Sequence, residues 1–310
     1  MRLGFLAALV GFLIALQSRI NGELSHQLGN PLQAALYSFS SGLLALGLVS
    51  LFIPGVRAGA VKIRVAVREG HIHKWKLFAG TLGATLVAVQ SQVVPILGVA
   101  IFSVATIAGQ TVASLAVDRL GLSSGGKRAV TLPRVVASVL TIAAVLISVW
   151  DRIDSNKISW LPVTISGLAG MLVGIQRALN GKINEYSRQS FTTSLLNFIT
   201  GTTFLAVIFI VGLLVHRTHI TAFGHGPWWI YFGGVVGGLY IAFAATVVQH
   251  LGALTSTFLT VGGQLLGSLL IDLVIPTHGV NVSLFLVTGI VMTYAGVVVG
   301  GSNQSLFARK

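Results

Sequence analysis

The sequence contains no cysteine, which excludes disulfide bridges, thiolate metal sites and cysteine nucleophiles together. It also lacks a phosphate-binding loop of the Gly-x-x-x-x-Gly-Lys-Ser/Thr form and any recognisable pairing of a nucleophile with a base. Two predicted loops hold clustered histidines, His71 and His73 in one and His216, His219 and His225 in the other. In neither loop does a carboxylate or cysteine complete a convincing metal site, so we expect these histidines to be solvated. We therefore expect a protein that is not an enzyme and that holds no metal and no cofactor.

Charge is scarce as well. Asp, Glu, Lys and Arg make up 9% of the chain, whereas soluble domains carry about 25%. Hydrophobic residues account for 54%, and the mean hydropathy is +0.88. So few charges could not cover the surface of a soluble protein of 310 residues, so we expect the chain to lie in a lipid bilayer.

The charges that are present are mostly basic, with 20 Lys and Arg against 7 Asp and Glu. They lie between apolar runs and are not interleaved with aromatic residues, which favours a role in membrane topology over nucleic-acid binding. If the N-terminus is inside, 16 Lys and Arg flank the inner ends of the predicted spans and 4 flank the outer ends. This bias predicts that both termini are cytoplasmic.

Ten apolar runs approach the length of about 20 residues that a helix needs to cross the hydrocarbon core. The first could be a signal peptide, but its pattern recurs in mid-chain, so we interpret it as a retained helix. The runs predict an all-α membrane protein with ten transmembrane helices, at residues 3–20, 32–53, 76–94, 97–117, 135–150, 161–179, 192–214, 228–248, 254–275 and 282–299.

The two halves of the chain repeat each other. LVGFLIALQSRING at residues 9–22 matches LAGMLVGIQRALNG at 168–181 in six of fourteen positions. A second match, between residues 97–118 and 251–272, is identical in eight of 22 positions. We therefore predict five-helix repeats at residues 1–150 and 161–303, joined by a loop at 151–160. Because five is odd, the second repeat is expected to be inverted in the membrane.

These features resemble a known family. The paired Gln-x-x-x-Asn-Gly motifs at residues 17–22 and 176–181, and the Leu-Gly…Gly-Gln…Asp runs, are similar to those of the YdcZ-type inner-membrane exporters of the drug/metabolite transporter superfamily. The resemblance covers residues 3–300. It implies a protein of the bacterial inner membrane, a ten-helix inverted-repeat bundle and a role in efflux.

Polar side chains inside the predicted spans are costly to bury in lipid, so they are candidate functional residues. Gln110 and Gln264 occupy matching positions well inside the fourth and ninth spans. Each could contact a polar substrate on its path. Each could instead make a hydrogen bond between helices, which has no transport role.

A second set of amides lies near the ends of the first and sixth spans. Gln17 and Asn21 are four residues apart, as are Gln176 and Asn180, so each pair shares a helix face. They could line substrate gates. The alternative is interfacial capping where the following glycines end the helices.

Two acidic residues, Asp118 and Asp272, end the fourth and ninth spans. They are candidates for proton or ion coupling at opposite faces of the membrane. The alternatives are solvated helix ends or, for Asp118, a salt bridge with Arg119.

The function that we predict is secondary transport, specifically export of a small metabolite or drug-like molecule by alternating access in a monomer or homodimer. A glycine stripe at residues 233–238 suggests one alternative, a non-transporting assembly or regulatory protein, because small residues allow close helix contacts. A passive channel is the other alternative.

Overall fold

The computed structural model describes residues 2–122, 130–154, 159–224, 226–277 and 282–301, and every regular element in these residues is helical. The prediction of an all-α chain is therefore confirmed for this part. Residues 155–158 of the predicted connecting loop and 302–303 of the predicted second repeat lie outside it.

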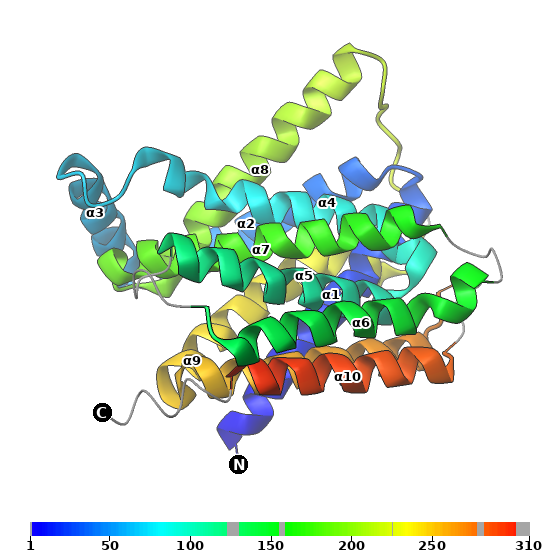
Figure 1. Ribbon diagram of the computed structural model, residues 1–310. Helices are drawn as coiled ribbons and strands as arrows, with labels where there is room; N and C mark the ends of the chain where they lie inside the picture. The colour runs from blue at the N-terminus through cyan, green and yellow to red at the C-terminus, as the bar shows by residue number, and fades with distance from the viewer. Residues whose placement is uncertain (1, 123–129, 155–158, 225, 278–281, 302–310) are drawn as a thin grey trace.

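The helices form one bundle (Figure 1). Within the described residues, eight helices are long and apolar enough to cross a membrane, and two shorter apolar helices cover Trp228–Ile241 and Leu284–Gly300. The elements in chain order are α1 (Arg2–Leu28), α2 (Pro31–Leu51), α3 (Gly55–Arg68), η1 (Lys74–Phe78), α4 (Ala79–Leu97), α5 (Val99–Leu120), α6 (Leu132–Asp154), α7 (Trp160–Ser187), α8 (Ser190–Leu214), η2 (Trp228–Phe232), α9 (Gly233–Val274) and α10 (Leu284–Gly301).

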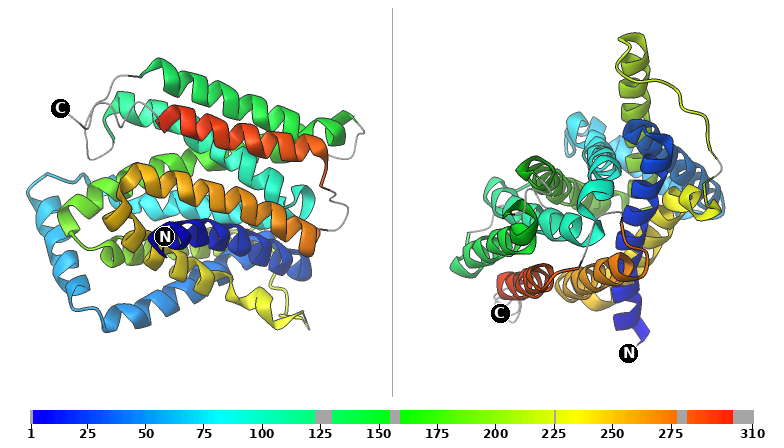
Figure 2. Two further views of the ribbon diagram at one scale, coloured as in Figure 1. Left: turned by 90° about the horizontal axis from the view of Figure 1, so that it is seen from below. Right: turned by 90° about the vertical axis from the view of Figure 1, so that its right-hand side faces the viewer.

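Helix α5 lies in the centre of the bundle. Residues 99–109 of this helix are all buried, and the largest hydrophobic cluster gathers around them. Helices α6 and α10 lie side by side at one edge (Figures 1 and 2). The chain breaks between α4 and α5 at Gly98, whose φ of 82° is readily adopted only by glycine. This break matches the short connection expected between the third and fourth spans.

The predicted loop between the second and third spans contains a helix that the sequence analysis did not anticipate. In α3, Val56, Ile63 and Ala66 are buried, while Arg57 and Arg64 are exposed on the other face. Because its mean hydropathy is low, this amphipathic helix was not detected as an apolar run.

Helix α9 covers both the eighth and ninth predicted spans, and the chain reverses direction within it. Gly233, at its beginning, lies against Asn21 of α1, and Ile275, just after its end, accepts a hydrogen bond of 3.2 Å from Arg19. A straight helix of 42 residues would be about 63 Å long, so its two ends could not both contact one turn of α1. Figure 2 shows α9 as two arms with α1 between them, and both arms pack on α1, at Gly237 and at Gly263.

Contacts between the two halves of the chain are reciprocal. Gly11 of α1 packs so closely on Thr260 that a β-carbon at Gly11 would overlap the Thr260 carbonyl oxygen. The matching residue of the second half, Gly170 of α7, packs in the same way on Thr106 of α5. Such exchange of equivalent residues across a contact is characteristic of a two-fold relationship.

Reciprocity extends to the turns. Where α2 begins, Asn30 and Gln33 make four hydrogen bonds of 2.7–3.0 Å with residues 218–221, which follow α8. At the matching place, Thr192 of α8 donates a hydrogen bond of 3.0 Å to the carbonyl oxygen of Val56, which follows α2. The connection between the first two helices of each half thus contacts the segment that follows the second helix of the other half.

Candidate functional site

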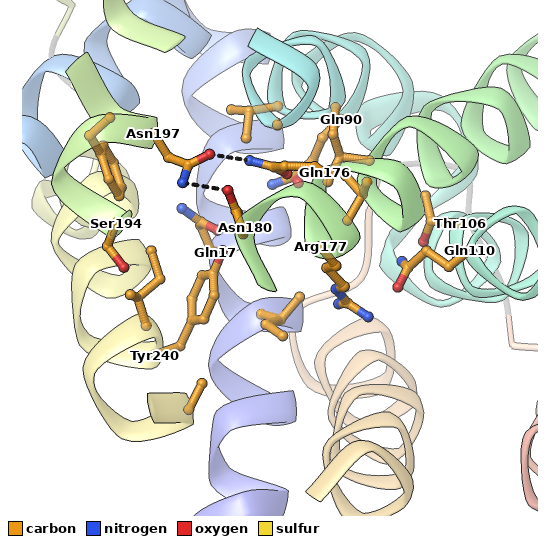
Figure 3. A pocket seen from close by; sticks show the side chains of 18 of the residues that line it. Gln17, Gln90, Thr106, Gln110, Gln176, Arg177, Asn180, Ser194, Asn197 and Tyr240 are labelled. Carbon is orange, nitrogen blue, oxygen red and sulfur yellow. Dashed lines mark hydrogen bonds between the residues drawn. The ribbon is translucent and has the colours of Figure 1, made fainter. Parts of the chain in front are cut away.

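Between the two halves lies a pocket of about 450 Å³ (Figure 3). Its lining residues come from α1, α2, α4 and α5 of the first half and from α7, α8 and α9 of the second. The volume falls within the range of roughly 300–1,000 Å³ that is typical of small-molecule sites.

Amide side chains dominate the polar part of the lining. Each amide can both donate and accept hydrogen bonds, so a ligand in this pocket meets both kinds of partner. The amide residues are Gln17, Gln90, Gln110, Gln176, Asn180, Asn184, Asn197 and Gln264.

Five of the six residues predicted to contact or gate a substrate line this pocket: Gln17, Gln110, Gln176, Asn180 and Gln264. Their roles as substrate contacts or gates stay predictions.

The sixth, Asn21, does not belong to the lining. Its side chain is fully buried against Gly233, and neither of its polar atoms has a hydrogen-bond partner in the described residues.

A hydrogen-bonded relay of three amides crosses from α7 to α8. Gln176 donates to the Oδ1 atom of Asn197 at 3.0 Å, and Asn197 donates to the Oδ1 atom of Asn180 at 2.9 Å (Figure 3). On α1, Gln17 donates to the carbonyl oxygen of Gly233 at 3.1 Å. These bonds orient the amides that face the pocket.

Gln90 of α4 is different, because its Nε2 group is buried and makes no hydrogen bond with the described residues. An unpaired buried donor costs free energy. Since Gln90 belongs to the pocket lining, a ligand acceptor could satisfy it.

Arg177 and Tyr240 also line the pocket, and neither was among the candidates from the sequence. The charge count treated Arg177 as a residue flanking the sixth span. In the structure α7 continues to Ser187, which places Arg177 ten residues, or about 15 Å, before the end of the helix. A comparison of the two repeats position by position could have singled out Arg177, because the matching residue of the first half is the uncharged Ser18.

Asp118 and Asp272 lie outside the pocket lining. Asp118 forms a salt bridge with Arg134 of α6, so the partner suggested by the sequence, Arg119, is not the one observed. Asp272 accepts hydrogen bonds from the backbone of α5. A coupling role for either carboxylate stays a prediction.

The two ends of the pocket differ. At the end formed by α7 and α8, the lining extends to Asn184 and Ser194. The residues of the first half that match these two, Ser25 and Ala35, are buried and do not belong to the lining. The matched glycines differ likewise, since a β-carbon at Gly22 would overlap Val94, whereas one at Gly181 would meet no atom within 4 Å.

No metal site competes with this pocket in the described part of the chain. There, His, Asp and Glu side chains nowhere gather in a group of three that could hold an ion. The clustered histidines predicted to be solvated include His225, which lies outside the described residues.

Known proteins resemble this chain. The profile of the family described as "Putative inner membrane exporter, YdcZ" matches residues 3–147 and again residues 161–299. The inner membrane protein YdcZ of Escherichia coli (strain K12) is 27% identical over 116 residues, which cover 36% of this chain and 74% of the relative.

One solved structure, described only as "Crystal structure of protein", covers 99% of this chain and 96% of its own, with a TM-score of 0.56. At 14% identity, this likeness supports a shared fold alone.

Proposed function

This chain belongs to the YdcZ family of inner-membrane exporters, and we propose that it is a secondary transporter that moves a small molecule across the inner membrane by alternating access. The family profile matches each half separately, so the chain is a tandem duplication of one family unit. Export is the direction that the family description supports.

The proposal includes ten membrane crossings, arranged as two inverted repeats of five. The reversal within α9 supports the count, because it divides that helix between two predicted spans. The contacts of the turns support the inversion. The end of α1 lies beside the segment that follows α8, and the end of α7 lies beside the segment that follows α2. Since α8 crosses back from the end of α7, α1 and α7 must run in opposite directions.

The observation that carries the transport proposal is an amide-lined pocket between matched halves, whose lining extends further toward the α7–α8 turn than toward the α1–α2 turn. Related repeats can exchange conformations, so that the open end closes as the closed end opens. The unequal packing of Gly22 and Gly181 is the arrangement expected of one state in such an exchange.

We assign the α7–α8 end of the pocket to the cytoplasm. The α7–α8 turn there lies against α3, which begins the most basic loop of the chain, and basic loops remain in the cytoplasm. Both termini then lie on the same side. A single chain encloses the pocket, so the mechanism requires no partner subunit.

The test is solute flux in proteoliposomes, using a panel of labelled organic acids, amino acids, amines and sugars. We expect saturable uptake and counterflow for at least one solute. The double variant Gln110→Leu/Gln264→Leu should lower this flux, whereas Gln27→Leu, which removes an exposed amide outside the pocket, should not.

Each alternative predicts a different result. A passive channel would give flux that rises linearly with concentration and shows no counterflow. A purely structural or regulatory protein would give no flux for any solute on the panel. Either result would overturn the proposed function.

A further inference from the structure

Arg177 is the one charged side chain among the described residues that line the pocket. Its side chain is exposed, and it makes no hydrogen bond or ion pair with the other described residues. The other arginine on this part of the repeat, Arg19, is buried and paired with Glu23 at 2.8 Å. Arg177 thus lacks the protein counter-ion that Arg19 has.

Acidic side chains that could neutralise Arg177 are engaged elsewhere. Asp118 pairs with Arg134, Glu185 with Lys182 at 3.0 Å, and Asp272 caps α5. The pocket lining contains no Asp or Glu in the described part of the chain. The pocket therefore carries one uncompensated positive charge among neutral amides and apolar side chains.

Comparison of the repeats shows that this charge is not required by the architecture. The residue of the first half that matches Arg177 is Ser18, and Tyr240 likewise stands where the first half has Leu86. All four residues line the pocket, yet only the second half supplies a cation and a phenol. Figure 3 shows Arg177 and Tyr240 at separate places on the lining.

We propose that the substrate is a small organic carboxylate, whose charged group is bound by Arg177. This inference rests on the proposed transport function and specifies its substrate class. A planar guanidinium matches a carboxylate in shape and can donate two parallel hydrogen bonds to it. The unpaired Nε2 group of Gln90 supplies a further donor for an anionic or neutral acceptor.

The rest of the pocket fits the body of such a molecule. Phe39, Phe102 and Phe198 line it and provide apolar surface for a hydrocarbon or aromatic portion. An amine of similar size would bring a second positive charge next to Arg177 with no carboxylate to compensate it, so the site selects against cations.

Thermal stability of the purified full-length chain in detergent tests the charge preference. The probes are matched trios that share a body and differ in charge: benzoate, benzamide and benzylamine; butyrate, butyramide and butylamine. A ligand that binds only the folded state raises the Tm. We expect at least one acid to raise the Tm, while its amide and amine do not.

Variants then assign the effect to Arg177. Arg177→Ser, which installs the residue of the first repeat, and Arg177→Gln should each weaken acid binding roughly 10- to 100-fold. The matched control Arg119→Ser removes an exposed arginine outside the pocket and should leave binding unchanged. Two substitutions are used so that one folding defect does not decide the outcome, and the Tm without ligand monitors folding.

The proposal is overturned if an amine or amide gives the larger shift, if no acid shifts the wild-type protein, or if both Arg177 variants retain the acid response. These failures are distinguishable from failure of the transport function. An amine that binds and shows counterflow would support the transport function and contradict the anion site. An acid that binds through Arg177 without saturable flux would support the anion site and contradict the transport function.

Discussion

The carboxylate of Asp272, at the end of α9, accepts a hydrogen bond of 2.8 Å from the backbone N–H of Ala100, at the beginning of α5. Its other oxygen accepts from the N–H of Val99 at 3.1 Å. The first N–H groups of a helix have no partner within it, and a negative charge there also complements the helix dipole. Asp272 therefore fastens the second half of the chain to the start of the most buried helix.

Removing this cap should destabilise the protein. We expect Asp272→Ala to lower the free energy of unfolding by about 1–3 kcal/mol, because two buried N–H groups lose a charged acceptor. Asp272→Asn, which keeps one acceptor oxygen, should cost less. Thermal unfolding in detergent measures both, with Glu69→Ala in an exposed turn as the control. An unchanged Tm for Asp272→Ala would contradict this role.

The close helix contacts at Gly109 and Gly263 should both be sensitive to an added methyl group. A β-carbon at either position would overlap a backbone carbonyl of α7 or α1, respectively. We expect Gly109→Ala and Gly263→Ala each to destabilise by about 1–3 kcal/mol. Gly47→Ala is the matched control, since no atom lies within 4 Å of its β-carbon. In that helix, alanine should be neutral or stabilise by roughly 0.5–1 kcal/mol.

Single-cysteine labelling tests the orientation cleanly, because the natural chain has no cysteine. Ile220→Cys places a thiol in the exposed segment after α8, and Lys62→Cys places one on the exposed face of α3. A membrane-impermeant maleimide added to spheroplasts should label Ile220→Cys and not Lys62→Cys. The opposite pattern would invert the assigned orientation, and equal labelling of both in intact spheroplasts would remove the predicted separation of the two loops.

Accessibility of the two pocket ends can be compared at matched positions. Asn184 and Ser25 are equivalent in the two repeats, but only Asn184 lines the pocket, and Ser25 is 4% exposed. In inside-out vesicles we expect the thiol of Asn184→Cys to react much faster than that of Ser25→Cys. A transported solute should slow the first and speed the second. Equal rates at both positions would argue against one-ended access.

Much of the fold was predictable because hydrocarbon imposes a length and a composition on each crossing. Eight described helices are long and apolar enough to cross a membrane, as the apolar runs predicted, while ten crossings and the inversion of the repeats stay predictions. Three features were missed for identifiable reasons. The apolar face of α3 is hidden by averaging over its basic face, and Arg177 was counted with the loop because α7 extends beyond its apolar run. The convergence of Gln90 and Asn197 on the pocket depends on tertiary packing, which no local pattern encodes.

The α1–α2 turn and the α7–α8 turn make unequal numbers of hydrogen bonds with the opposite half of the chain. Asn30 and Gln33 make four hydrogen bonds with residues 218–221, whereas Thr192 makes one with Val56. At roughly 1 kcal/mol each, these bonds hold the α1–α2 turn more firmly than the α7–α8 turn is held. A carrier of the proposed kind would therefore open more readily at the α7–α8 end, which the proposed orientation places where a molecule awaiting export is found.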